Sequence, residues 1–200
     1  MKSWFVACCV VLVATPLWAG ALVAKIQSML AKPNVLCGHF DQSKQLTGLK
    51  KPMMSNGRFC VVADKGVLWR TVRPFPNTVR LTRDEIVHLQ GGRVTMRLDA
   101  KQEPAVRMIN GVLFALLAGD LEPIENLFEV DGRIHDTKWS VTLKARQPGL
   151  AKIISGVALD GGAYVTNITI SETSGDRTGI VFSKIETGDA AMSVDEASLF

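Results

Sequence analysis

The chain has 200 residues, of which 47% are hydrophobic and 21% charged, and its formal net charge is +4. This apolar content excludes an intrinsically disordered chain, and the length suits one globular domain rather than several. Aromatic residues make up only 6%, with a single tyrosine, which argues against a surface that stacks nucleic-acid bases, so we expect no nucleic-acid partner.

The N-terminus matches a cleavable secretion signal. Lys2 gives a short positive start, residues 4–14 are apolar and uncharged, and a small-residue cleavage site ends at Ala21. The apolar run is shorter than the roughly 20 residues that a membrane-spanning helix requires. We therefore expect residues 1–21 to be a cleaved signal peptide and residues 22–200 to form a single exported domain.

Two cysteines remain after this signal, Cys37 and Cys60. An exported protein meets an oxidising compartment, where such a pair forms a disulfide or stays as two buried thiols. The three histidines do not have the spacing to either cysteine that a metal site needs. We predict no metal and no cofactor.

Periodicity predicts the elements in chain order. Apolar residues at helical spacing predict a helix over 22–32, which Pro33 follows. Period-two alternation and turn residues then predict a first group of strands, with the Gly- and Pro-containing stretch 48–57 as a turn. These strands are 35–46, 58–63, 66–73, 77–83, 85–90 and 93–99.

A different pattern interrupts the strands. Residues 104–119 predict a helix that is apolar nearly all round and must therefore be covered on several sides. Strands then resume at 127–131, 138–146, 151–159, 163–171 and 179–186. The chain ends in a tail, 187–200, that is small and polar apart from its last residues. The whole pattern predicts a mainly β fold, a curled antiparallel sheet of about ten to eleven strands with helices.

Several short segments occur in a recognisable order. They are Gly38-His39-Phe40-Asp41-Gln42, Gly57-Arg58-Phe59, Lys65-Gly66-Val67-Leu68-Trp69-Arg70 before Pro74, Trp139-Ser140-Val141-Thr142-Leu143-Lys144, and Asp176-Arg177-Thr178. With the apolar helix between them, this set resembles the LolA family of periplasmic outer-membrane lipoprotein carriers over nearly all of residues 22–186.

The resemblance implies an incomplete, half-open antiparallel β-barrel that is closed by an α-helical lid and holds acyl chains in an apolar cavity. It implies a monomeric periplasmic carrier, in a Gram-negative bacterium, that moves an acylated lipoprotein or lipid from an inner-membrane exporter to an outer-membrane receptor. Two alternatives remain open. One is a periplasmic lipid or lipoprotein sensor of the same fold (RseB-like), and the other is a carrier of a glycolipid or polyene lipid.

If Trp69 faces the cavity, strand alternation assigns its neighbours. The predicted cavity residues are Phe40, Phe59, Val61, Ala63, Val67, Trp69, Val79, Leu81, Met96 and Leu98, and the predicted lid residues are Ile109, Leu113, Phe114 and Leu117. Cys37 and Cys60 then share the opposite face, which is consistent with a cross-strand Cys37–Cys60 disulfide worth roughly 3 kcal/mol. The resemblance also implies a gating arginine on the second strand, where this chain has Ala63.

Two further patterns bear on function. Between Arg70 and Arg97, six arginines stand against two acidic residues, which fits either a solvated sheet face or docking of an anionic headgroup or acidic partner. No nucleophile elbow, P-loop or zinc-protease motif is present. His39, Asp41 and Ser43 share a strand face but lie about 7 Å apart in succession, too far for a hydrogen-bonded relay. We predict no catalytic residues and no enzymatic activity.

Overall fold

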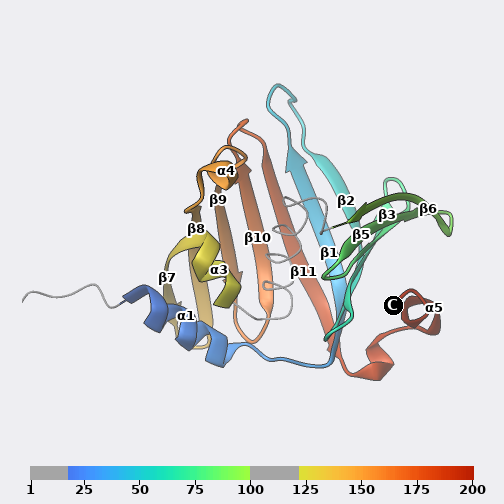
Figure 1. The fold of residues 1–200 in the computed structure, drawn as a ribbon, viewed down its shortest axis with the longest axis horizontal. Coiled ribbons are helices and arrows are strands. Elements are labelled where there is room, and N and C mark those ends of the chain that lie inside the picture. Colours follow the sequence, from blue (N-terminus) through green and yellow to red (C-terminus); the bar gives the residue numbers. More distant parts are fainter. Residues whose placement is uncertain (1–17, 100–121) are drawn as a thin grey trace, which may run out of the picture.

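The computed structural model describes residues 18–99 and 122–200, which form one eleven-stranded sheet with short helices beside it (Figure 1). The first strands are β1 (Val35–Gln45), β2 (Met53–Val62), β3 (Gly66–Arg73), β4 (Asn77–Leu81), β5 (Glu85–Gln90) and β6 (Arg93–Asp99). The later strands are β7 (Phe128–His135), β8 (Lys138–Ala145), β9 (Ile154–Gly161), β10 (Val165–Glu172) and β11 (Arg177–Thr187). The helices are α1 (Trp18–Met29), α3 (Glu122–Leu127), α4 (Pro148–Ala151) and α5 (Val194–Ala197), with a 3₁₀ turn η1 (Asp189–Ala191).

Alternation along each strand explains why these segments pair. In β8, Trp139, Val141 and Leu143 are buried, while the residues between them are exposed or half-buried. Successive side chains of a strand point to opposite faces, so this pattern places one apolar face on a core.

The order of strands in the sheet is β6-β5-β4-β3-β2-β1-β11-β10-β9-β8-β7, with antiparallel neighbours throughout. The first strand therefore lies in the middle of the sheet, between β2 and the last strand, and within the described residues β6 and β7 are its two edges. The predicted mainly β fold, an open antiparallel sheet of ten to eleven strands, is confirmed.

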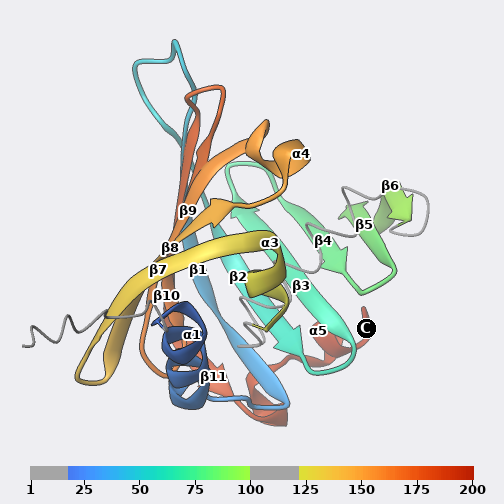
Figure 2. The same cartoon turned by 60° about the vertical axis from the view of Figure 1, so that its left-hand side comes forward.

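The larger hydrophobic core lies on the inner face of the sheet. Val23 and Ile26 of α1 and Ile124 of α3 are buried in it together with the inward side chains of the strands. Both helices contact β7, and Figure 2 shows them on the same side of the sheet. A smaller core lies on the outer face, where η1, α5 and the last residues cover the beginning of β1 and the end of β2.

The structure corrects several boundaries; the strand predicted at 127–131 continues to His135 as β7, and the one predicted at 151–159 is β9, which begins only at Ile154. The stretch 48–57 is not wholly a turn, because β2 begins at Met53, which pairs with Lys44 of the long strand β1. The backbone hydrogen bonds that β1 offers outweigh a local composition that favours turns. Helix α1 begins at Trp18 rather than residue 22, so it spans the predicted cleavage site. The tail 187–200 folds onto the outer face, where Ala191, Met192, Leu199 and Phe200 join the smaller core.

The division into a signal peptide, residues 1–21, and one domain, residues 22–200, stays a prediction. Within the described ranges, no helix is both long and apolar enough to cross a membrane.

Candidate functional site: an apolar cavity on the inner face

Four aromatic side chains from four strands meet on the inner face of the sheet. Phe40 of β1 stacks on Trp69 of β3, with ring centroids 3.8 Å apart. Phe59 of β2 lies 4.9 Å from Phe182 of β11 and 6.1 Å from Trp69, again between centroids. The strand register produces this cluster, because Phe40 is paired with Phe182 and Phe59 with Trp69. Tilted ring pairs such as Phe59–Phe182 stabilise a core beyond the area they bury.

A cavity of about 220 Å³ lies beside this cluster. Its walls come from β1, β3, β4, β10 and β11, and all but one of the lining side chains are apolar. They are Gln42, Val67, Trp69, Val79, Leu81, Ile168, Ile180 and Phe182. A cavity with such walls has few groups that could hydrogen-bond a polar ligand, and it suits a hydrocarbon chain.

Most of the predicted cavity residues do face this region. Phe40, Phe59, Val61, Val67 and Leu81 are buried members of the inner core, and Trp69, Val79 and Leu98 are half-buried and pack against it. Of these, Val67, Trp69, Val79 and Leu81 line the cavity itself. They form two cross-strand pairs, Val67 with Leu81 and Trp69 with Val79.

Two predicted residues, Ala63 and Met96, belong neither to the cavity lining nor to the inner core. Ala63 follows the end of β2, is exposed, and occupies the turn before β3. The position that the resemblance assigned to a gating arginine is therefore not on the inner face. Met96 of β6 is 42% exposed, because β6 is an edge strand, two strands beyond β4.

Sequence reasoning missed the far wall of the cavity, which Ile168 of β10 and Ile180 of β11 form. Ile168 of β10, Ile180 of β11 and Gln42 of β1 form one row across the sheet through successive register pairs. Alternation within β10 and β11 shows which residues share a face, but not which face joins Trp69. That assignment requires the pairing of β1 with β11, which are more than 130 residues apart in sequence. The predicted lid residues Ile109, Leu113, Phe114 and Leu117 lie outside the described residues.

The opposite face of the same strands carries a disulfide. Cys37 of β1 and Cys60 of β2 are directly paired in the register, form a disulfide, and are at most 1% exposed. Ala191 belongs to the same small core, and Met192, Leu199 and Phe200 pack against it. The predicted pairing and its location opposite the cavity both agree with the structure.

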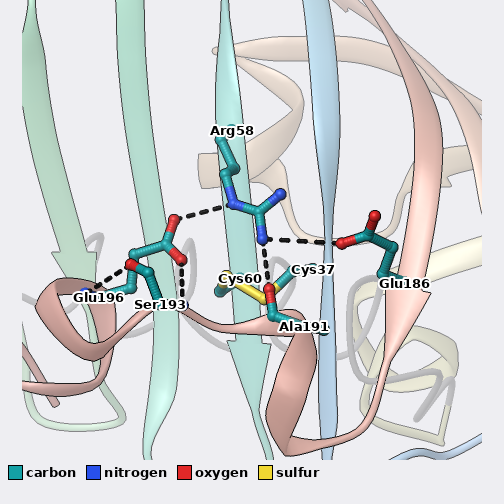
Figure 3. The surroundings of a disulfide bond; sticks show 7 residues. All are labelled: Cys37, Arg58, Cys60, Glu186, Ala191, Ser193 and Glu196. Carbon is teal, nitrogen blue, oxygen red and sulfur yellow. Dashed lines mark hydrogen bonds and ion pairs between the residues drawn. A yellow bond between two sulfur atoms is a disulfide. The ribbon is translucent and has the colours of Figure 1, made fainter.

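A charged network holds the C-terminal segment over this disulfide (Figure 3). Arg58 Nε lies 2.9 Å from Glu196 Oε1, its guanidinium also donates to the carbonyl of Ala191, and Glu186 is 3.9 Å away. Glu196 is only 3% exposed and closes a capping box with Ser193 at the start of α5. Arg80 of β4 donates a further hydrogen bond, 3.1 Å long, to the carbonyl of Leu199.

Two opposing effects set the pKa of Glu196. Burial raises it, but the backbone N–H of Ser193 and the positive charge of Arg58 lower it by more, so the pKa lies below the ordinary value of 4.5. Glu196 is therefore ionised at neutral pH and attracts Arg58 as a full charge.

Two observations concern metal binding and the residues His39 and Asp41. Within residues 18–99 and 122–200, no three His, Cys, Asp or Glu side chains group closely enough to hold a metal ion. His39 and Asp41 alternate on the outer face of β1, as predicted, and both line a groove that is described below.

The model of a protein family described as outer membrane lipoprotein carrier protein LolA-like matches residues 19–198. The chain belongs to this LolA-like family. The matched range contains all eleven strands and the whole apolar cavity of this LolA-like protein. No curated protein sequence matches the chain.

Three solved structures are similar to this LolA-like chain at low identity. A LolA superfamily protein from Nitrosomonas europaea is 7% identical, with a TM-score of 0.47 and coverage of 86% of this chain and 94% of that one. The MucA/MucB complex from Pseudomonas aeruginosa gives 14% identity, a TM-score of 0.48, and coverage of 87% and 62%. LprF from Mycobacterium bovis is 11% identical, with a TM-score of 0.38 and coverage of 86% of this chain and 97% of that one. These distant similarities identify no ligand and no partner.

Proposed function

We propose that this protein is a periplasmic carrier that binds the acyl chain of a lipoprotein or lipid in the inner-face cavity and moves it from the inner to the outer membrane. The observation that carries the proposal is the apolar cavity of about 220 Å³ in a chain of the LolA-like family. The export signal predicted at residues 1–21 supports a periplasmic location.

The chemistry of the cavity fits an acyl chain. Burial of hydrocarbon contributes about 0.8 kcal/mol per methylene group. A chain of about 14 carbons would therefore gain on the order of 10 kcal/mol if it were wholly buried. A carrier needs a gain of this size to keep its cargo out of water between membranes.

The volume of the cavity limits how much of an acyl chain it can hold. An apolar cavity of about 150 Å³ is large enough for benzene. At about 220 Å³, the cavity has room for only part of a long acyl chain. We therefore propose that the cavity widens as cargo enters, and that Ile109, Leu113, Phe114 and Leu117 cover it as a lid. Because such binding is slow to reverse unaided, an inner-membrane exporter and an outer-membrane receptor are the proposed partners.

The test compares two adjacent residues on opposite faces of β11. Ile180 lines the cavity, whereas Val181 is 51% exposed on the outer face. Ile180→Trp fills the cavity and should weaken binding of an acyl fluorophore at least tenfold, because the loss of two buried methylene contacts already costs about 1.6 kcal/mol. Val181→Trp places the same new side chain on the outer face of the same strand and should leave binding unchanged.

Native mass spectrometry of protein purified from the periplasm provides the second measurement. Wild-type protein and the Val181→Trp variant should carry a co-purifying lipid or acyl group, and Ile180→Trp should not. Equal acyl binding by both variants, or no lipid and no fluorophore binding in the wild type, would contradict the proposal. Recovery of a membrane signalling protein in place of an exporter or receptor would contradict the carrier role.

A further inference from the structure

A second hollow lies on the outer face of the sheet, on the side away from the apolar cavity. It is a groove of about 700 Å³ between β1, β2, β3 and β11. Its charged lining is mostly cationic, with Arg58, Arg70, Arg73 and Lys184 against a single acidic residue, Asp41. The groove therefore differs from the cavity in both location and chemistry.

An irregularity in β3 brings two of these arginines to one face. Arg70 is paired with Arg58 and therefore points outward. Regular alternation would turn Arg73, three residues later, to the inner face. The register instead shifts, so that Asn56 is paired with Arg73 while Gly57 is paired with Thr71. This bulge inserts one extra residue and returns Arg73 to the face of Arg70.

A second irregularity lies across the groove in β11. Between the pairs Cys37–Glu186 and His39–Ser183, β11 contains one residue more than β1. Lys184 lies in this interval with a φ of 50°, a left-handed conformation that non-glycine residues rarely adopt. Bulges of this kind redirect side chains and are concentrated beside functional sites. Two of them flank this groove, and each adds a cation to it.

Three of these four cations have no acidic partner among the described residues. Arg58 is engaged with Glu196, Glu186 and the carbonyl of Ala191. Arg70, Arg73 and Lys184 are exposed and have no acidic side chain within salt-bridge distance among the described residues. Like charges placed directly opposite each other on paired strands destabilise a sheet, as Arg58 and Arg70 are here. A bound anion would remove that repulsion.

We propose that this outer groove is a binding site for a phosphate-type anion, held by Arg70, Arg73 and Lys184. Guanidinium groups match phosphate oxygens with two parallel hydrogen bonds, and a lysine adds a mobile point charge. Three uncompensated cations around one groove suit a multiply charged phosphoryl group better than a single carboxylate. The anion is either a soluble phosphate compound or the headgroup of an anionic lipid. The site faces away from the apolar cavity, so it does not depend on the proposed acyl binding.

Calorimetric titration of the full chain with inorganic pyrophosphate at low ionic strength tests the site. Arg70→Gln and Arg73→Gln should each weaken binding about tenfold, because each removes a charge-assisted hydrogen-bonding group. Lys184→Asn should weaken it less, and asparagine tolerates the left-handed backbone. Arg133→Gln is the matched control, since Arg133 is an exposed strand arginine on β7, the far edge of the sheet. It should bind as the wild type does.

Vesicle flotation separates the two sources of the anion. Pyrophosphate binding without retention on vesicles indicates a soluble ligand, and retention on phosphatidylglycerol but not phosphatidylcholine vesicles, lost in Arg70→Gln, indicates a headgroup. Either result supports the proposal. It is overturned if neither probe binds, if Arg133→Gln weakens binding as much as Arg70→Gln, or if polyglutamate binds the groove more tightly than pyrophosphate.

Discussion

Removal of the Cys37–Cys60 disulfide should destabilise the protein by about 3–5 kcal/mol. The two cysteines are separated by 23 residues, and a cross-link that closes a loop of this length removes unfolded-state entropy worth about 3.4 kcal/mol at 25 °C. Both side chains are also buried, at 0% and 1% exposure, so replacing both with alanine leaves a void that adds to the loss. Little of this cost can be recovered by relaxation, because both strands lie in the middle of the sheet.

The measurement is urea unfolding of the wild type and of the Cys37→Ala/Cys60→Ala double variant, followed by tryptophan fluorescence. The mass of the native protein gives the oxidation state, which should be two hydrogens below that of the reduced chain. Since the C-terminal segment covers the disulfide, reductant should reach it slowly in the folded protein and quickly in urea. A loss below about 1 kcal/mol, or two thiols that alkylate readily in the native protein, would refute this reasoning.

Three further predictions test the packing around the two faces. Glu196→Gln should lower stability at neutral pH by about 1–2 kcal/mol, because the charged acceptor for Arg58 is lost. Because folding lowers the pKa of Glu196, its contribution to stability is complete above the ordinary value of 4.5 and disappears as the pH falls through the lower pKa of the folded state. The urea midpoints of the wild type and the variant should therefore converge in acid. Gly57→Ala should prevent stable folding, since a Cβ at this position would overlap a carbonyl oxygen of β3. Gly179→Ala is the control: a Cβ at Gly179 would meet open space, so this variant should unfold near the wild-type urea midpoint. Trp139→Phe should lower stability by about 1–3 kcal/mol in the same assay, because it removes a buried indole N–H that donates a 2.9 Å hydrogen bond to a backbone carbonyl. An unchanged urea midpoint would show that water replaces the lost donor.

Local alternation was enough to predict most of the sheet. The strands 85–90 and 93–99 were predicted with the boundaries that β5 and β6 have, because each is a short alternating run between clear turn signals. The same argument placed Cys37 and Cys60 on one face and the aromatic residues of β1–β3 on the other, since the parity of a strand is a property of the sequence alone.

Local sequence did not determine features that depend on pairing between strands. The start of β2 at Met53 depends on the hydrogen bonds that the end of β1 offers, although the local composition favours a turn. The groove cations could not be assigned to one face, because the bulges beside Arg73 and Lys184 break the alternation on which such an assignment rests.

Only the tertiary structure completed the cavity and covered the disulfide. The far wall, Ile168 and Ile180, depends on the pairing of β1 with β11, a contact between opposite ends of the chain. In the tail, the charged residue Glu196 is buried because Arg58 is located where α5 docks. Periodicity records how a segment divides between two faces, whereas long-range pairing decides which segments share a face, and that information is not local in the sequence.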